Sequence, residues 1–311
     1  MLQFLIYLSL AIFIAGLAIK IRKIIKMPVH LRWELYPVPH EKGKAHYGGS
    51  YFEEPDWWLK PRQKSFLNEL KEMAREIFAI QTLFVNNKKL WLFSFPFHLG
   101  LYLLTAFIIL LIIGAAIHSS GIIIDSLAYG PLIRLIHYAT NISGSLGFIL
   151  GAIGAAGLLF NRIFRAELRH YSSRADYFNL LLLLAIFISG IISWLYDSYS
   201  FAILRSFIQS LLFFNYAPAI QLPAKILIIL TGIFLAYLPF THMTHFVGKY
   251  FTYHTVRWQD TPNVSGSLSE NSLAKSLASH PTWSAPHIAG GKTWSELTSN
   301  SNDSKDKPDT K

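Results

Sequence analysis

The most constraining feature of this sequence is a set of long stretches without a Lys, Arg, Asp or Glu residue. Five of them cover residues 1–19, 90–124, 135–161, 177–196 and 226–248. A bilayer core requires about 20 mostly apolar residues in a helix, because only a helix satisfies its own backbone hydrogen bonds in lipid. The sequence therefore predicts an all-α integral membrane protein.

The positions of the basic residues predict how this protein lies in the membrane. Of 28 Lys and Arg residues, 25 lie in 20–89, in 162–174 or after residue 246, and the other loops hold only Arg134, Arg205 and Lys225. Basic residues accumulate in cytoplasmic loops. This distribution requires five crossings, with the N-terminus outside and the C-terminus in the cytoplasm.

These counts divide the chain into helices, loops and a tail. A sixth apolar segment, 206–223, is interrupted by polar residues and proline, and we expect it to lie at the membrane interface. The first helix is not expected to be a cleaved signal peptide, because its basic cluster follows the apolar run. The transmembrane helices are predicted over residues 1–19, about 90–118, 135–161, 177–196 and 225–247.

Two segments are predicted to lie in the cytoplasm. The loop 20–89 contains an amphipathic helix over 63–80, which is expected on the membrane surface or against a partner. The tail 249–311 is rich in Ser, Thr, Asn, Asp and Lys after residue 261, so that part is expected to be largely disordered.

The chain contains no cysteine. This excludes thiolate zinc sites, iron–sulfur clusters held by cysteine and covalent c-type haem within this chain. A redox centre here requires histidine, methionine or carboxylate ligands.

Three histidines are predicted at one membrane depth on the cytoplasmic side. His98 lies about 12 Å into the second helix, and His242 and His245 lie near the end of the fifth. Ionisable side chains in a membrane mark functional sites, and histidines from two helices are what a haem iron requires for axial ligation. Alternatively, each is a helix-end histidine bonded to a nearby carbonyl. Spacing leaves the choice between His242 and His245 open.

A second group of polar side chains is predicted on the outer side. His118 ends the second helix and His137 opens the third, and Arg134 and Asp125 are the charged residues between them. The two histidines are candidates for a second haem, or for accepting a proton from a quinol. The two charged residues are candidates for contacting a quinol head group or a haem propionate, or for anchoring the chain at the interface.

Five glycines recur along the third helix at three- or four-residue intervals, namely Gly144, Gly147, Gly151, Gly154 and Gly157. Small residues at this spacing allow helices to approach closely in a membrane. We expect them to serve helix packing, with contact to a flat cofactor as the alternative.

Two longer motifs carry a resemblance to a known family. They read HLRWELYPVPHEKGKAHYGGSYFEEPDWW over 30–58 and LPFTHMTHFVGKYFTYHTVRWQD over 238–260. With the five-helix plan, they resemble the respiratory nitrate reductase gamma-subunit family. Within it, the resemblance is closest to the cytochrome b subunits of sulfite-reduction-associated membrane complexes, also called Hdr-like menaquinol oxidoreductases. It covers about residues 1–260.

The resemblance implies a nitrate reductase gamma-like bundle that holds haem b and is linked to menaquinol. Its inner haem would be ligated by His98 and His245. The family's outer haem positions correspond to about Ile108 and Leu227, which cannot bind iron, so a second haem would need His118 and His137.

The resemblance also implies partners. Electrons would pass to a cytoplasmic iron–sulfur subunit of the Hdr-D-like type, in a membrane complex of the respiratory chain that serves sulfur metabolism. We place its contact at the loop between Trp33 and Trp58, whose aromatic residues suit an interface, although a lipid-facing aromatic belt is the alternative. No nucleic-acid partner is expected.

Two other classes of function compete with this interpretation. A membrane anchor without a cofactor, which holds a soluble oxidoreductase, fits the same helices. A transporter is disfavoured because the sequence has neither an internal repeat nor an acidic or basic residue at a predicted helix centre.

Overall fold

The computed structural model describes residues 1–26, 38–39, 41, 43, 50–61, 64–125, 130–216, 218–254, 258, 264–285, 288 and 290–303. The chain forms two compact units. The first comprises Met1–Leu17 and Leu70–His242, and the second comprises Ala18–Glu69 and Met243–Lys311.

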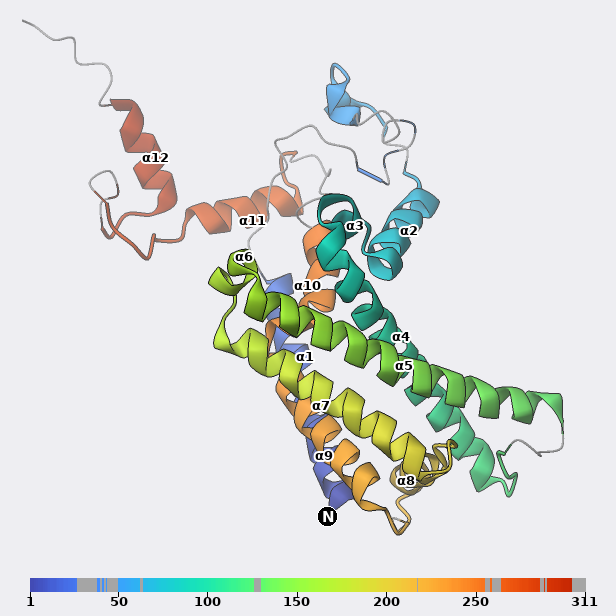
Figure 1. The fold of residues 1–311 in the computed structure, drawn as a ribbon. Coiled ribbons are helices and arrows are strands. Elements are labelled where there is room, and N and C mark those ends of the chain that lie inside the picture. Colours follow the sequence, from blue (N-terminus) through green and yellow to red (C-terminus); the bar gives the residue numbers. More distant parts are fainter. Residues whose placement is uncertain are drawn as a thin grey trace, which may run out of the picture. The chain divides into compact units, whose positions relative to one another are not determined.

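Five helices are long and apolar enough to cross a membrane, as the sequence predicts. They are α1 (Leu2–Ile25), α4 (Lys88–Ser119), α5 (Pro131–Phe164), α7 (Arg174–Tyr196) and α9 (Leu222–Tyr237), the last extended by a 3-10 turn to Phe240. Figure 1 shows α4, α5, α7 and α9 as the long helices of the first unit. The structure is 77% helical and the described residues contain no strand, so the fold is all-α, as in an integral membrane protein.

Local signals at the helix ends explain where these helices begin. The Asn87 side chain accepts a hydrogen bond from the Leu90 backbone at the start of α4. At the start of α7, Ser173 and Asp176 form a reciprocal capping box. Side-chain acceptors at these positions satisfy backbone N–H groups that have no partner within the helix.

Close packing of α4 against α5 forms the centre of the first unit. A Cβ atom added at Gly154 would lie 2.4 Å from the Phe97 backbone nitrogen, and one at Gly100 would lie 2.5 Å from the Gly151 nitrogen. A Cβ atom added at Gly144 or Gly157 would likewise collide with aromatic side chains of neighbouring segments. The described contacts therefore support the packing interpretation of the glycine pattern.

The helix α8 (Ala202–Leu212) corresponds to the predicted interfacial segment but begins earlier and is partly buried. Leu204, Arg205, Phe207 and Ser210 are its buried residues, and it packs against α4. The N-terminal part of α1 is attached at the end of α8, where Gln3 donates to the Ser210 carbonyl at 3.2 Å and Tyr7 donates to the Leu211 carbonyl at 2.6 Å.

The fifth membrane helix ends ten residues before its predicted end. Its α-helical part stops at Tyr237, a 3-10 turn follows over Leu238–Phe240, and a second turn covers His242–Thr244. Pro239 explains this break, because proline has no N–H to donate and its ring clashes with the preceding helical turn. His242 and His245 therefore lie outside α9.

Short helices precede α4 and connect α5 with α7. The predicted amphipathic helix corresponds to α2 (Phe66–Ala74) and a π-helical turn over Arg75–Ala79, followed by α3 (Gln81–Asn86). Its apolar side chains Phe66, Leu67, Leu70 and Phe78 are exposed. The connection between α5 and α7 contains α6 (Ala166–His170).

The second unit contains α10 (His245–Thr252) and two tail helices, α11 (Leu268–Leu277) and α12 (Trp294–Asp303). The expectation of a largely disordered tail does not match these two helices. Ser267 caps α11 by accepting a hydrogen bond from Glu270 at 3.0 Å, and the Trp294 backbone donates to the Ser279 carbonyl at 3.1 Å. Local capping thus outweighs the polar composition of this segment.

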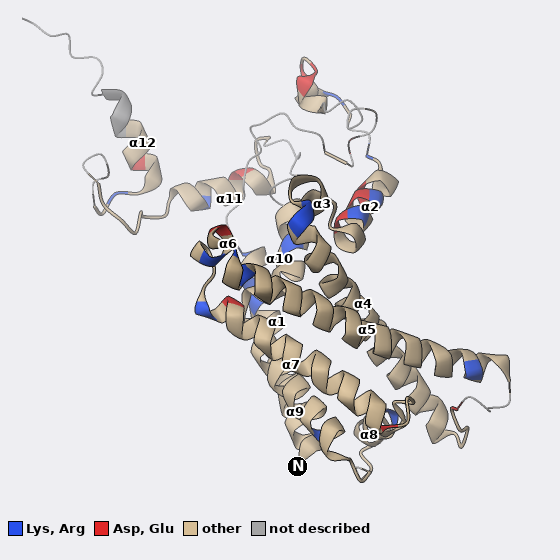
Figure 2. Ribbon diagram, viewed as in Figure 1, with Lys and Arg blue, Asp and Glu red and all other residues tan. Residues whose placement is uncertain are grey.

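Charged residues of the first unit lie mainly near the ends of its long helices. Figure 2 shows the middles of α4, α5, α7 and α9 without Lys, Arg, Asp or Glu colouring, and basic residues around α6 and the start of α4. The other end of the unit, formed by the end of α4, the start of α5 and α8, carries few charged residues. We call this the α8 end.

Candidate functional site

His98 lies on α4 and is oriented by the backbone. Its Nδ1 lies 2.7 Å from the Ser94 carbonyl oxygen, which can only accept, so Nδ1 carries the proton. Nε2 is then the unprotonated nitrogen, and an unprotonated ring nitrogen is the one that binds a metal. A ligating histidine typically donates its other N–H to a carbonyl in this way. The half-buried side chain therefore has the chemistry of an axial ligand.

His242 has a different partner. Its Nε2 lies 3.3 Å from Oδ1 of Asp176 at the start of α7, and its side chain is 63% exposed. Asp176 also caps α7 and lies 3.8 Å from Arg162. The contact gives His242 a structural role in joining the end of the fifth membrane segment to α7.

His245 is the first residue of α10, and its side chain is exposed. Thr244, which precedes it, is buried and receives a hydrogen bond from the Lys20 ammonium group. His98 and His242 belong to the first compact unit and His245 to the second.

At the α8 end, His137 is buried while His118 is half-buried. His118 Nδ1 lies 3.3 Å from the Ile122 carbonyl. His137 Nε2 accepts from the Asn141 side chain at 3.2 Å. His137 Nδ1 is buried without a hydrogen bond of normal geometry among the described residues, although the Ile124 backbone lies near the ring. The two rings thus have different hydrogen-bond partners.

The two predicted charged residues of this region differ in their positions. Asp125 is half-buried and acts electrostatically on His137. Arg134 is exposed, and its side chain has no hydrogen bond or ion pair in the part of the chain that the structure describes. The structure therefore brings Asp125 to His137 and leaves Arg134 at the surface.

Arg205 is a functional candidate that the sequence reasoning missed, having counted it only as an outer-loop charge. It lies on α8, is 5% exposed, and donates from Nη1 to the Ile124 carbonyl at 3.1 Å. Burial lowers the pKa of the Arg205 guanidinium, while the nearby Asp197 carboxylate opposes that effect. A lone charge in an otherwise apolar helix was the signal that could have identified it.

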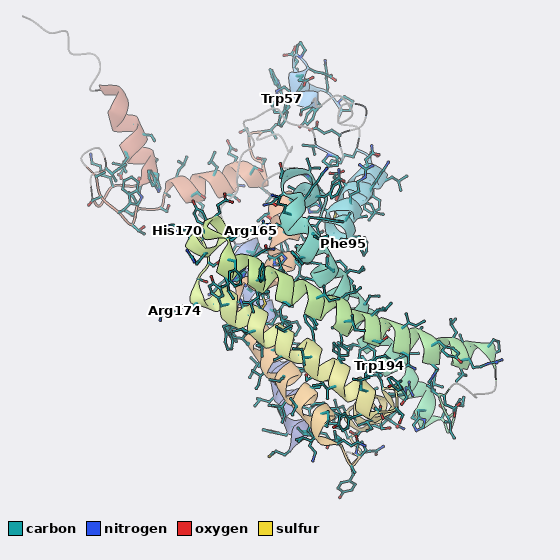
Figure 3. All side chains as sticks on the ribbon, viewed as in Figure 1. Trp57, Phe95, Arg165, His170, Arg174 and Trp194 are labelled. Atoms are coloured by element: carbon teal, nitrogen blue, oxygen red, sulfur yellow. The ribbon has the colours of Figure 1, made fainter. Side chains whose placement is uncertain are left out.

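Asp197 is the C-terminal cap of α7 and lies between α7 and α8 in the sequence; Trp194, in the last turn of α7, is labelled in Figure 3. Its Oδ2 accepts from the Ile203 backbone at 3.0 Å. Burial raises the pKa of the Asp197 carboxyl, against the opposing effect of backbone hydrogen bonds and of Arg205.

The predicted partner loop is described only in part. Trp33 and Tyr36 lie outside the described residues. Within the described part, Tyr51, Phe52 and Trp57 form an aromatic cluster, with the Phe52 and Trp57 ring centroids 4.4 Å apart. Trp58, beside this cluster, is 53% exposed. An exposed aromatic residue next to a packed cluster suits a protein interface.

Comparison with protein families identifies one match. The model of the nitrate reductase gamma subunit matches residues 73–261, which is more than half of the 311-residue chain. The matched range includes α4, α5, α7, α8, α9 and all of the candidate ligands above. A comparison with curated proteins finds no match. The chain therefore belongs to the nitrate reductase gamma-subunit family, whose members are membrane cytochrome b subunits of respiratory redox complexes.

Proposed function

We propose that this chain is the b-type cytochrome subunit of a menaquinol-linked respiratory complex. It would carry electrons from menaquinol in the membrane to a cytoplasmic iron–sulfur subunit of the Hdr-D-like type. The observation that carries the proposal is the His98 ring on α4, oriented by the hydrogen bond from Nδ1 to the Ser94 carbonyl, within a family of haem-binding membrane subunits.

His98 and His245 are the proposed axial ligands of haem b, which supplies one-electron transfer chemistry when bound. The Ser94 carbonyl fixes the His98 tautomer and ring orientation. His242 is the alternative to His245. The contact of His242 Nε2 with Asp176 leaves Nδ1 as the nitrogen that would face the iron, and His245 is preferred because it matches the ligand position of the family pattern.

Menaquinol oxidation is proposed at the α8 end, which the distribution of basic residues assigns to the outside. His118, His137, Arg134 and Asp125 are the proposed quinol-site residues. Buried His137 beside Asp125 is the best supported of them. His118 and His137 remain the proposed ligands if a second haem is present, although the hydrogen bond that His137 Nε2 accepts from Asn141 favours the quinol-site role.

The iron–sulfur partner is proposed to dock on the cytoplasmic loop. Since the chain has no cysteine, the next electron carrier belongs to another subunit. The exposed Trp58 and the adjoining aromatic cluster of Tyr51, Phe52 and Trp57 support an interface there.

The proposal is tested by adding menadiol, a soluble menaquinol analogue, to the oxidised full chain in detergent. We expect reduction of a b-type haem that saturates with menadiol concentration. A haem that dithionite reduces but menadiol does not would contradict the link to menaquinol. A folded chain without haem would instead support a cofactor-free membrane anchor.

A further inference from the structure

Several buried polar atoms at the α8 end lack hydrogen-bond partners among the described residues. They are Nε and Nη2 of Arg205, Nδ1 of His137 and Oδ1 of Asn141. Buried polar groups in native proteins are almost always hydrogen-bonded, so unpartnered ones point to water or a ligand. Arg205 and His137 are both more than nine-tenths buried, with exposed fractions of 5% and 9%.

These atoms belong to one neighbourhood that α4, α5 and α8 build together. Arg205 Nη1 is held by the Ile124 carbonyl at 3.1 Å, and Arg205 acts electrostatically on His137. On the α4 side, a Cβ atom added at Gly114 would lie 3.1 Å from Arg205 Nε. The guanidinium is thus fixed between helices, as a preorganised binding group should be.

The hydrogen-bonding character of the neighbourhood follows from Asn141. Its Nδ2 donates both to the His137 carbonyl and to His137 Nε2, each at 3.2 Å. The proton of the neutral His137 ring is therefore on Nδ1. Three donor nitrogens, namely Nε and Nη2 of Arg205 and Nδ1 of His137, and one acceptor, the Asn141 amide oxygen, lack hydrogen bonds of normal geometry, although the Ile124 backbone also approaches the His137 ring. Such groups complement an oxygen that accepts and a hydroxyl that donates.

The charges of this neighbourhood favour a neutral ligand. Asp197 lies near Arg205, and Asp125 lies near His137. These two carboxylates already offset the guanidinium, so an anion such as a propionate or a lipid phosphate is not required. A quinone or quinol head group is neutral and carries the required oxygen and hydroxyl chemistry.

We propose that Arg205, together with His137, binds an oxygen of the menaquinone head group at the α8 end. This inference rests on the proposed function. It adds a binding residue on α8 to the proposed quinol site. It also assigns the contact with the head group to buried Arg205 in preference to the exposed Arg134.

The test compares Arg205→Gln with the unchanged full chain in the menadiol reduction assay. Loss of one charge-assisted hydrogen bond is expected to raise the menadiol concentration that gives half-maximal reduction by about tenfold or more. Haem content and the dithionite-reduced spectrum are expected to stay unchanged. Lys225→Gln is the matched control, because Lys225 is an exposed cation at the α8 end.

Two milder variants keep the proposal testable if Arg205→Gln does not fold. Arg205→Lys retains the charge without the planar fork and is expected to give a smaller increase. Gly114→Ala places a methyl group against Nε and is also expected to weaken menadiol binding, while leaving every charge in place.

Other outcomes would overturn the inference. An unchanged half-saturating menadiol concentration in all three variants would mean that buried water, and not the quinone, hydrogen-bonds these groups. Lower haem content in Arg205→Gln, with an unchanged half-saturating menadiol concentration for the haem that remains, would assign the guanidinium to a haem propionate. If menadiol did not reduce the haem of the unchanged chain, both the proposed function and the Arg205 inference would be overturned. If menadiol reduced the unchanged chain and all variants at the same half-saturating concentration, only the Arg205 inference would be overturned.

Discussion

His98 owes its orientation to one short hydrogen bond from Nδ1 to the Ser94 carbonyl, 2.7 Å long. We predict that His98→Ala abolishes low-spin haem b, because the other histidine of α4, His118, lies at the far end of that helix and cannot fill the vacant axial position. His245→Ala is expected to have the same effect. The measurement is haem per polypeptide together with the visible spectrum of the purified variants.

His254→Ala is the matched control for those variants. Both His254 ring nitrogens already have partners, since Nδ1 lies 2.7 Å from the Tyr250 carbonyl and Nε2 lies 2.7 Å from Glu69. This variant should retain haem. Full haem content in either His98→Ala or His245→Ala would show that the ligand assignment is wrong.

Asp197 provides a prediction about pH. Its raised pKa means that the charged form is disfavoured in the folded state relative to the unfolded state. The contribution of Asp197 to the free energy of unfolding is thus fully present below the ordinary aspartate pKa, and it is lost as pH rises through the raised pKa. The stability of Asp197→Asn relative to the unchanged chain should therefore increase with pH across that interval. Thermal unfolding in detergent at several pH values between about 3.5 and 6 measures this difference; a constant difference would contradict it.

The sequence identified the candidate residues of the site more readily than their surroundings. The positions of His98 and His137 within apolar segments were enough to select them. The burial of Arg205 was not predictable, because it depends on α8 packing into the unit rather than lying along the interface. Similarly, spacing alone could not separate His242 from His245, and it did not reveal that His242 has a carboxylate partner in Asp176.

At the scale of elements, the contact between α4 and α5 depends on glycines that face backbone atoms. A methyl group at Gly154 would lie 2.4 Å from the Phe97 nitrogen and 2.6 Å from its Cα. Backbone atoms cannot rotate away, so Gly154→Ala is predicted to destabilise the protein by about 1–3 kcal/mol. Thermal unfolding in detergent checks this.

Gly248→Ala is the matched control, because it lies within α10 and an added Cβ meets nothing within 4 Å. It should leave stability unchanged or raise it slightly, since alanine favours helix over glycine. Equal effects of the two substitutions would contradict the packing interpretation.

The five membrane helices were predictable because hydropathy and length determine them almost alone. Their ends were less so. The α-helical part of α9 stops at Tyr237 because Pro239 interrupts it, although apolar residues continue beyond. The tail helices α11 and α12 depend on local capping by residues such as Ser267, which overall composition does not reveal.

At the scale of the whole molecule, the distribution of basic residues predicts an outer N-terminus and a cytoplasmic tail. The absence of cysteine allows a direct test, since a single introduced cysteine is the only thiol. We predict that Ser120→Cys, after α4, reacts with a membrane-impermeant maleimide in intact cells. Ser279→Cys, after α11, should react only after permeabilisation. The reverse pattern would invert the topology and move the proposed quinol site to the cytoplasmic side.

The central claim is that this chain holds haem b. It is tested most directly by counting haem per polypeptide through the pyridine haemochrome of the purified full chain, together with its reduced-minus-oxidised spectrum. We predict a b-type spectrum and one haem, held by His98 and His245. Two haems would add His118 and His137 as the second ligand pair. A folded chain that was produced with ample haem and contains none would contradict the claim.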